Sequence, residues 1–140
     1  MKASEVRRQV QQAPDKRQRL PPPEGSKSSR SYLSKYPETF KNKPENFTNL
    51  QSKTPRKEYP LVAEPGKNWV PRASGPAEKV RGVYNSNDRN KIDVVYHNAK
   101  ESKDTAANFS LANYRPSRYP AEPEAGSRRS SEGRWNYQQR

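Results

Sequence analysis

One segment constrains the fold more than any other: the run from Ile92 to His97, which carries the only histidine of the chain. Its β-branched and aromatic residues favour an extended strand. Because alternate residues of a strand face opposite sides, Ile92, Val94 and Tyr96 share an apolar side that can pack on a helix. The other side carries Asp93, Val95 and His97. The run therefore predicts a sheet strand with one covered face and one open face.

Four further segments have the same character, with β-branched and aromatic residues between Pro, Gly and Asn. These predicted strands are Tyr36–Phe40, Lys57–Val62, Lys79–Tyr84 and Phe109–Leu111. Several short strands after a single helix are typical of an α+β fold. We therefore expect one N-terminal helix packed on a small twisted antiparallel sheet with long loops.

The helix is predicted over residues Ala3–Ala13. Ser4 is the expected N-cap, and Val6 and Val10 lie four residues apart on one face. Pro14 then ends the helix. The following stretch, residues 15–30, is charged and proline-rich, which predicts a loop.

The apolar content limits how much of the chain can be core. Only 28% of the 140 residues are hydrophobic, and 14 are prolines. Part of the chain is therefore expected outside the packed domain. Residues 113–140 are dominated by Arg, Ser, Pro, Glu and Gly, which predicts a disordered basic tail. We expect a single domain over residues 1–112.

The charge favours polyanionic partners. With 28 Lys and Arg against 15 Asp and Glu, the net charge is +13, and such a field attracts nucleic acid or, second, an anionic membrane. The sequence contains no apolar run that could span a bilayer or serve as a signal peptide. Without cysteine, and with one histidine, the chain offers no disulfide, thiol or multi-histidine metal chemistry. We predict RNA as the partner, with no metal or cofactor.

Three charged side chains are predicted to converge on the open face. If the strands that carry Glu58, Arg81 and His97 are neighbours, alternation places a carboxylate, a guanidinium and an imidazole together. Cleavage of RNA by its own 2′-hydroxyl needs a base, an acid and positive charge at the phosphoryl oxygens. Glutamate suits the base, an ordinary imidazole with a pKa near 6.5 suits the acid, and arginine holds phosphate bidentately. The alternative is a packing histidine beside two solvated charges.

The same segments occur in the order of a known family. The motifs are Tyr36-Pro37-Glu38-Thr39-Phe40-Lys41-Asn42, Glu58-Tyr59-Pro60-Leu61, Ser74-Gly75-Pro76-Ala77 with Arg81-Gly82-Val83-Tyr84, Asp93-Val94-Val95-Tyr96-His97-Asn98, and Asn108-Phe109. Together they resemble the microbial guanyl-specific ribonuclease and fungal ribotoxin family, which includes α-sarcin and, distantly, barnase. The resemblance covers residues 3–112 and implies a metal-independent endoribonuclease that forms a 2′,3′-cyclic phosphate. It also implies a guanine preference and a secreted toxin or effector, which we expect to be a monomer.

The resemblance implies a role for each matched position. Glu58 would be the general base, His97 the general acid, Arg81 the phosphate clamp and Tyr36 a hydrogen-bond donor to the phosphate. The loop 41–46 would read guanine. The residues implied for substrate binding are Lys41, Asn42, Lys43, Glu45, Asn46 and, in the later motif, Asn108.

Two positions depart from the family pattern. Glu38 stands where the family has a histidine that helps to activate the 2′-hydroxyl. Lys79 competes with Arg81 for the clamp position, because the arginine strand is longer here. Two alternatives therefore stay open: a catalytically impaired ribonuclease that binds RNA, and an extended basic structural protein that coats RNA.

Overall fold

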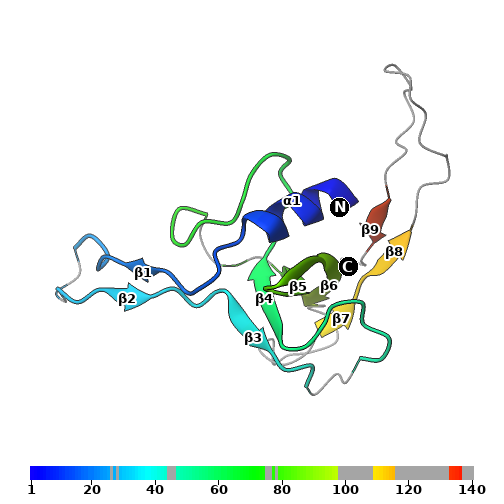
Figure 1. Ribbon diagram of the computed structural model, residues 1–140. Coiled ribbons are helices and arrows are strands. Elements are labelled where there is room, and N and C mark those ends of the chain that lie inside the picture. Colours follow the sequence, from blue (N-terminus) through cyan, green and yellow to red (C-terminus); the bar gives the residue numbers. More distant parts are fainter. Residues whose placement is uncertain are drawn as a thin grey trace.

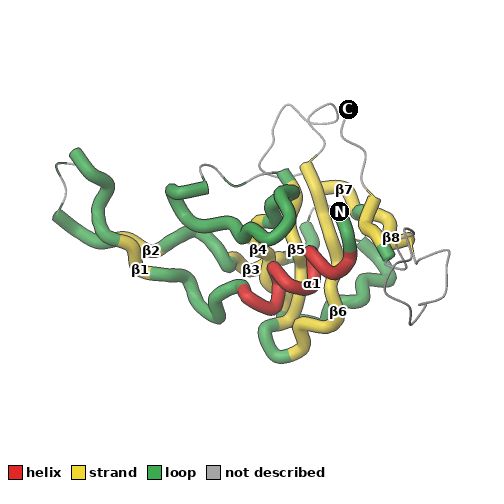
Figure 2. Tube along the Cα trace, turned by 90° about the horizontal axis from the view of Figure 1, so that it is seen from above, coloured by secondary structure: helices red, strands yellow, loops and turns green. Residues whose placement is uncertain are grey.

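The computed structural model describes residues 1–25, 27, 29–43, 47–74, 77, 79–97, 109–115 and 133–136. Among these residues a single helix, α1 (Ala3–Gln12), lies against one side of a five-stranded antiparallel sheet (Figure 1 and Figure 2). The strands follow chain order: β3 (Glu38–Phe40), β4 (Arg56–Pro60), β5 (Val80–Asn85), β6 (Asp88–His97) and β7 (Phe109–Leu111). The predicted α+β class is confirmed.

The sheet has two faces, which the backbone register defines because directly paired residues point the same way. The face toward α1, here called the helix face, carries Tyr59, Gly82, Tyr84, Ile92 and Val94. It buries Val6 and Val10 of the helix in the main core. The helix can approach closely because residue 82 is glycine: a Cβ there would lie 2.8 Å from Val10 Cγ2.

The opposite face, here called the polar face, combines charged side chains with a small apolar cluster. Its residues include Glu38, Glu58, Arg81, Asp93 and His97. The apolar cluster is formed by Phe40, Val83 and Val95, with Phe47, Leu50, Phe109 and Leu111 packed against it. The alternation predicted from the sequence thus separates helix contacts from charged groups.

The start of α1 differs from the prediction. The N-cap is Lys2, which is extended and makes no capping bond through its side chain, whereas the predicted cap Ser4 lies inside the helix. Lys2 is extended because it forms a β-bridge with Arg134, and the amide of Ala3 donates to Gly133 O at 2.8 Å. Backbone pairing therefore replaces the side-chain cap.

The end of α1 is capped by a side chain from the sheet. Arg89 on β6 donates to the carbonyl oxygens of Val10 at 3.0 Å and Ala13 at 2.6 Å, and it also pairs with Asp15. Val10 O also accepts from the amide of Ala13 at 3.3 Å, so the guanidinium adds a second donor there, binds the carbonyl oxygen of Ala13 and complements the helix dipole. The helix ends at Gln12, one residue before the predicted end, because Ala13 is extended and is followed by Pro14.

Residues 15–30 were predicted to be loop, which is wrong for one short piece. Strand β1 (Arg19–Leu20) pairs with β2 (Tyr32–Leu33) and forms a hairpin, here called the arm, that projects away from the sheet (Figure 1). Ser34 closes its base, since Gln18 N donates to Ser34 Oγ at 2.9 Å and Ser34 N donates to Gln18 O at 2.7 Å.

The predicted disordered tail is also wrong for two described pieces. β8 (Asn113–Arg115) pairs with β9 (Arg134–Asn136), and Trp135 belongs to the main core. The amide of Trp135 donates to Met1 O at 2.9 Å, so the N-terminus holds the other edge of β9. The burial of the large apolar ring of Trp135 explains why this segment forms a strand. Its basic neighbours would not stabilise a strand by themselves. The rest of residues 116–140 lies outside the described part of the chain.

Candidate functional site

The register places three predicted site residues on one diagonal of the polar face. Glu58 on β4 lies opposite Val83, Arg81 on β5 lies opposite Val95, and His97 on β6 lies opposite Phe109. Each step from one to the next crosses one strand and moves two residues along it. Diagonal neighbours of this kind have Cα atoms about 7–8 Å apart. Arg81 therefore lies between the carboxylate and the imidazole.

Arg81 is a buried cation whose hydrogen bonds, among the described residues, go to neutral groups. It is 5% exposed, and the ion pairs among the described residues do not include it. Its Nη2 donates to the hydroxyl of Tyr36 at 3.2 Å, its Nη1 makes a long contact with Val80 O, and its Nε has no hydrogen-bond partner. A buried guanidinium in this state has unused donors, which a bound anion would satisfy.

Tyr36 is held in place from two sides. Its ring lies edge-on to Trp69, with centroids 5.7 Å apart, and the Arg81 guanidinium carbon is 5.1 Å from its ring centroid. Because its hydroxyl oxygen accepts from Arg81, the hydroxyl hydrogen remains available for donation. The geometry would allow the Tyr36 hydroxyl and Arg81 to donate to the same anion.

His97 is half-buried and oriented by its neighbours. Its ring stacks on Phe109, with centroids 4.0 Å apart and planes at 30°. Its backbone amide donates to Lys79 O at 3.0 Å. Stacking on Phe109 restricts the rotation of the imidazole.

The two glutamates of the site face each other across β3 and β4. Glu38 is directly paired with Glu58; Glu38 is exposed, whereas Glu58 is 7% exposed. Two carboxylates on adjacent strands repel each other when both are ionised. The departure from the family pattern therefore lies directly beside the proposed base.

The predicted loop residues have mixed positions. Lys41 and Lys43 are exposed, and Lys79 is exposed beside the His97 backbone. Asn42 has a positive φ of 54°, and its amide closes the loop: its Nδ2 donates to Phe47 O at 3.0 Å, and its Oδ1 accepts from Phe47 N at 2.8 Å. The side chain of Asn42 is therefore used within its own loop. The predicted binding residues Glu45, Asn46 and Asn108, with Gly75, Pro76 and Asn98 of the motifs, lie outside the described residues.

A buried carboxylate that sequence reasoning did not assign also lies on the polar face. Asp93 accepts hydrogen bonds from the amides of Gln51 and Ser52, at 3.0 and 2.8 Å, and from Ser52 Oγ at 2.5 Å. These bonds attach the segment Gln51–Ser52, which precedes β4, to strand β6 on the polar face. Alternation placed Asp93 on the same face as His97, but nothing in the sequence could identify its partners, which are 41 and 42 residues away along the chain.

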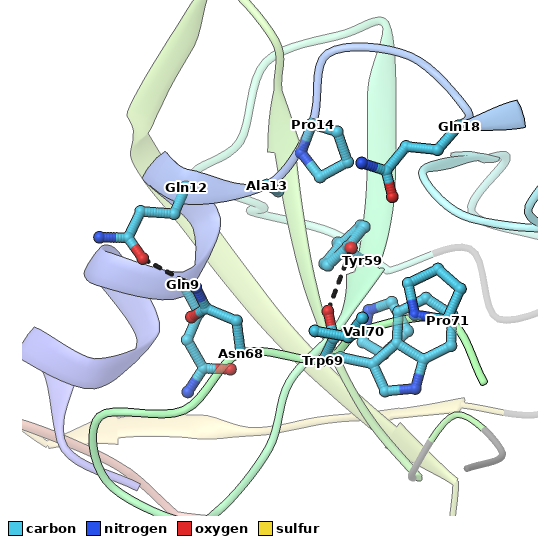
Figure 3. A pocket seen from close by; sticks show the side chains of 11 residues that line it. Gln9, Gln12, Ala13, Pro14, Gln18, Tyr59, Asn68, Trp69, Val70 and Pro71 are labelled. Carbon is cyan, nitrogen blue, oxygen red and sulfur yellow. Dashed lines mark hydrogen bonds between the residues drawn. The ribbon is translucent and has the colours of Figure 1, made fainter. Parts of the chain in front are cut away.

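A pocket of about 210 Å³ lies on the helix side, between α1, β4 and the segment that carries Trp69 (Figure 3). Gln12 Oε1 accepts from Asn68 Nδ2 at 2.8 Å, and the Tyr59 hydroxyl donates to Trp69 O at 3.3 Å. Because these groups already bind each other, the pocket lining fastens the segment to the helix.

Within the described residues, no group of three or more His, Cys, Asp or Glu side chains could hold a metal ion. No described helix is long and apolar enough to cross a membrane. Comparison with protein-family models, with curated proteins and with solved structures gives no match for this chain. The site must therefore be interpreted from its own residues.

Proposed function

We propose that this chain is a metal-independent endoribonuclease that cleaves RNA through a 2′,3′-cyclic phosphate. The observation that carries the proposal is the buried Arg81, which has unused donors and lies between a carboxylate and an imidazole. Guanine preference, secretion and a toxin or effector role remain predictions of the family resemblance.

The reaction assigns one task to each residue. Glu58 removes the proton of the ribose 2′-hydroxyl, whose oxygen forms a bond to phosphorus, and the bond from phosphorus to the 5′-oxygen breaks. His97, protonated, gives its proton to that leaving oxygen. In-line displacement puts the attacking and leaving oxygens on opposite sides of the phosphorus, which matches a base and an acid on either side of Arg81. Arg81 and Tyr36 hold the phosphoryl oxygens.

The test uses a labelled single-stranded RNA and its 2′-O-methyl analogue, both incubated in EDTA. We expect cleavage of the RNA to a 2′,3′-cyclic phosphate and no cleavage of the analogue, which lacks the nucleophile. Glu58→Gln and His97→Ala should each lower the rate by about 10²- to 10⁴-fold. Glu64→Gln, which changes an exposed acid in a loop, is the matched control and should keep the wild-type rate.

The pH dependence tests the two roles separately. The rate should rise as Glu58 loses its proton and fall as His97 loses its own, which gives a bell-shaped profile. His97→Ala should remove the alkaline limb, whereas Glu58→Gln should remove the acid limb. Full cleavage by His97→Ala would refute the assignment of the acid.

A second candidate, RNA binding without cleavage, is favoured by the position of Glu38. A second carboxylate opposite Glu58 repels the phosphate from the base. Intact RNA after incubation with wild-type protein, together with salt-sensitive binding, would select this candidate. A cooperative thermal unfolding transition of the isolated chain would exclude the extended structural protein.

A further inference from the structure

A groove of about 630 Å³ lies where the arm meets the edge of the sheet. Its lining comes from both sides of the arm, from the edge strand β3 and from β4. The charged residues of this groove, here called the basic groove, are Lys16, Arg17, Lys35, Lys41, Lys57 and Glu38. Five cations therefore face one carboxylate.

The cations of the basic groove are not neutralised by ion pairs within the described part of the chain. Arg17 Nε donates to Ser34 O at 2.5 Å, and Lys57 Nζ donates to Asp15 O at 3.0 Å. Both acceptors are backbone carbonyls, which fix the side chains without cancelling their charge. Lys16, Lys35 and Lys41 are exposed. The groove therefore concentrates positive charge, and two of its five cations are held in place by hydrogen bonds.

The groove meets the polar face at the edge strand β3, although Lys57, which lies opposite Tyr84, points to the helix face. Glu38 lines the groove and is directly paired with Glu58 on the polar face. A nucleic-acid strand with one phosphate at Arg81 can therefore place neighbouring phosphates along the edge of β3. A membrane surface fits less well than RNA for two reasons. The lining is concave, and Leu33 is the one large exposed apolar side chain among its described residues, whereas membrane binding needs an apolar face.

We propose that the basic groove binds the backbone of single-stranded RNA beyond the scissile phosphate, so that the substrate is a strand several nucleotides long. Positively charged grooves that follow the backbone are the usual means of binding single strands. This inference rests on the proposed function for the identity of the strand. Its binding test, however, does not depend on cleavage.

The experiment compares two triple variants with equal loss of charge. The groove variant is Lys16→Gln, Lys35→Gln and Lys57→Gln; the control variant is Arg7→Gln, Lys67→Gln and Lys91→Gln, at exposed positions outside the groove. The ligand is a 2′-O-methyl dodecamer, which has no free 2′-hydroxyl and so cannot be cleaved. Its binding constant is measured at salt concentrations from about 0.05 to about 0.5 M. Thermal unfolding checks that both variants are folded.

For single strands, log K falls with log salt by about 0.7 for each neutralised phosphate. In the groove variant, we expect the magnitude of this slope to fall by about 2 and the affinity at about 0.1 M salt to fall about 100-fold. The control variant should keep most of the wild-type slope and affinity. The advantage in kcat/KM of a dodecamer RNA over a dinucleotide should fall in the groove variant by a similar factor.

Other outcomes separate the two proposals. Equal losses in both variants would overturn the groove, since bulk charge would then explain binding. Loss of binding to phosphatidylserine vesicles with an unchanged RNA slope would also overturn it. If wild type cleaves a dinucleotide but the groove variant keeps its slope, the groove fails and the cleavage proposal stands. If the slope falls only in the groove variant but no RNA is cleaved, the groove stands and the cleavage proposal fails.

Discussion

The two faces of the sheet bury different chemistry. On the helix face, Tyr84, Ile92 and Val94 pack against Val6 and Val10. On the polar face, the same strands bury Arg81 and Asp93, at 5% and 4% exposure. Burial of apolar surface stabilises the fold, whereas burial of charge costs free energy unless partners compensate for it. The helix face therefore stabilises the fold, whereas the buried charges of the polar face lower the net stability.

The polar face itself contains two kinds of buried charge. Asp93 accepts three hydrogen bonds from the segment Gln51–Ser52, so its charge is compensated within the fold. Arg81 has one neutral side-chain partner, Tyr36, and an unpaired Nε. A satisfied charge serves the structure, and an unsatisfied one points to a ligand. Of the two buried charges, Arg81 is therefore the one that indicates a binding site.

The largest effect is expected on the helix face. Leu61, at 1% exposure, packs against the position of Gly82, and Leu61→Ala should lower the free energy of unfolding by about 4 kcal/mol. Cleavage per folded molecule should stay at the wild-type rate. Urea denaturation measures the first, and an assay corrected for the folded fraction measures the second. Val70→Ala, at an exposed position, should change stability by less than about 0.5 kcal/mol.

The opposite result is expected at Arg81. Arg81→Met keeps the bulk of the side chain but removes a buried charge, so the free energy of unfolding should stay constant or rise by about 1 kcal/mol. Cleavage should fall by about 10²- to 10³-fold, which is about 3–4 kcal/mol of transition-state stabilisation. Arg81→Lys tests the planar fork, because lysine keeps the charge but binds phosphate at a single point. A clear loss of stability in Arg81→Met would mean that the guanidinium serves the fold.

A smaller effect tests the contact between helix and sheet. In Gly82→Ala the new Cβ would lie 2.8 Å from Val10 Cγ2, and valine cannot move easily because its χ1 is restricted. We expect a loss of about 2 kcal/mol in urea denaturation. Val10→Ala should recover part of that loss, with a coupling of about 1 kcal/mol. Strictly additive losses would show that the helix shifts instead.

The sequence predicted the division between the two faces because a strand alternates with a period of two. That rule put Asp93 and His97 on the face opposite Val94. Runs of β-branched and aromatic residues between Pro, Gly and Asn placed all five strands of the sheet within a few residues. The predicted series of strands also turned out to be the spatial order of the sheet. Local residue type was sufficient for these features.

Long-range contacts could not be predicted in this way. Trp135 pairs with Met1 across nearly the whole chain, and three residues of β9 are too few to show a period. The cap on α1 comes from Arg89, a residue that resembles any other cation in the sequence. The diagonal from Glu58 to His97 depends on the register, which pairing across strands fixes. The isolation of Arg81 likewise depends on what the fold brings near it.

The smallest expected effect at neutral pH lies at Tyr84, at the centre of the helix face. Its hydroxyl is buried, and it has no hydrogen-bond partner in the described part of the chain. Tyr84→Phe removes that unsatisfied group, so the free energy of unfolding should rise by about 1 kcal/mol at pH 7. Urea denaturation of both proteins measures the difference, and a loss of stability would mean that the hydroxyl has a partner.

The same substitution should matter more in alkali. Burial raises the pKa of Tyr84 from its ordinary value near 10 to about 12. Above pH 10 the unfolded chain loses this proton while the folded protein keeps it, so stability falls between pH 10 and pH 12, by about 2–3 kcal/mol in total. Tyr84→Phe should remove most of that loss. A smaller part should remain, because burial also raises the pKa of Tyr59. An alkaline transition unchanged by Tyr84→Phe would place the sensitive group elsewhere, with Tyr59→Phe as the next variant to measure.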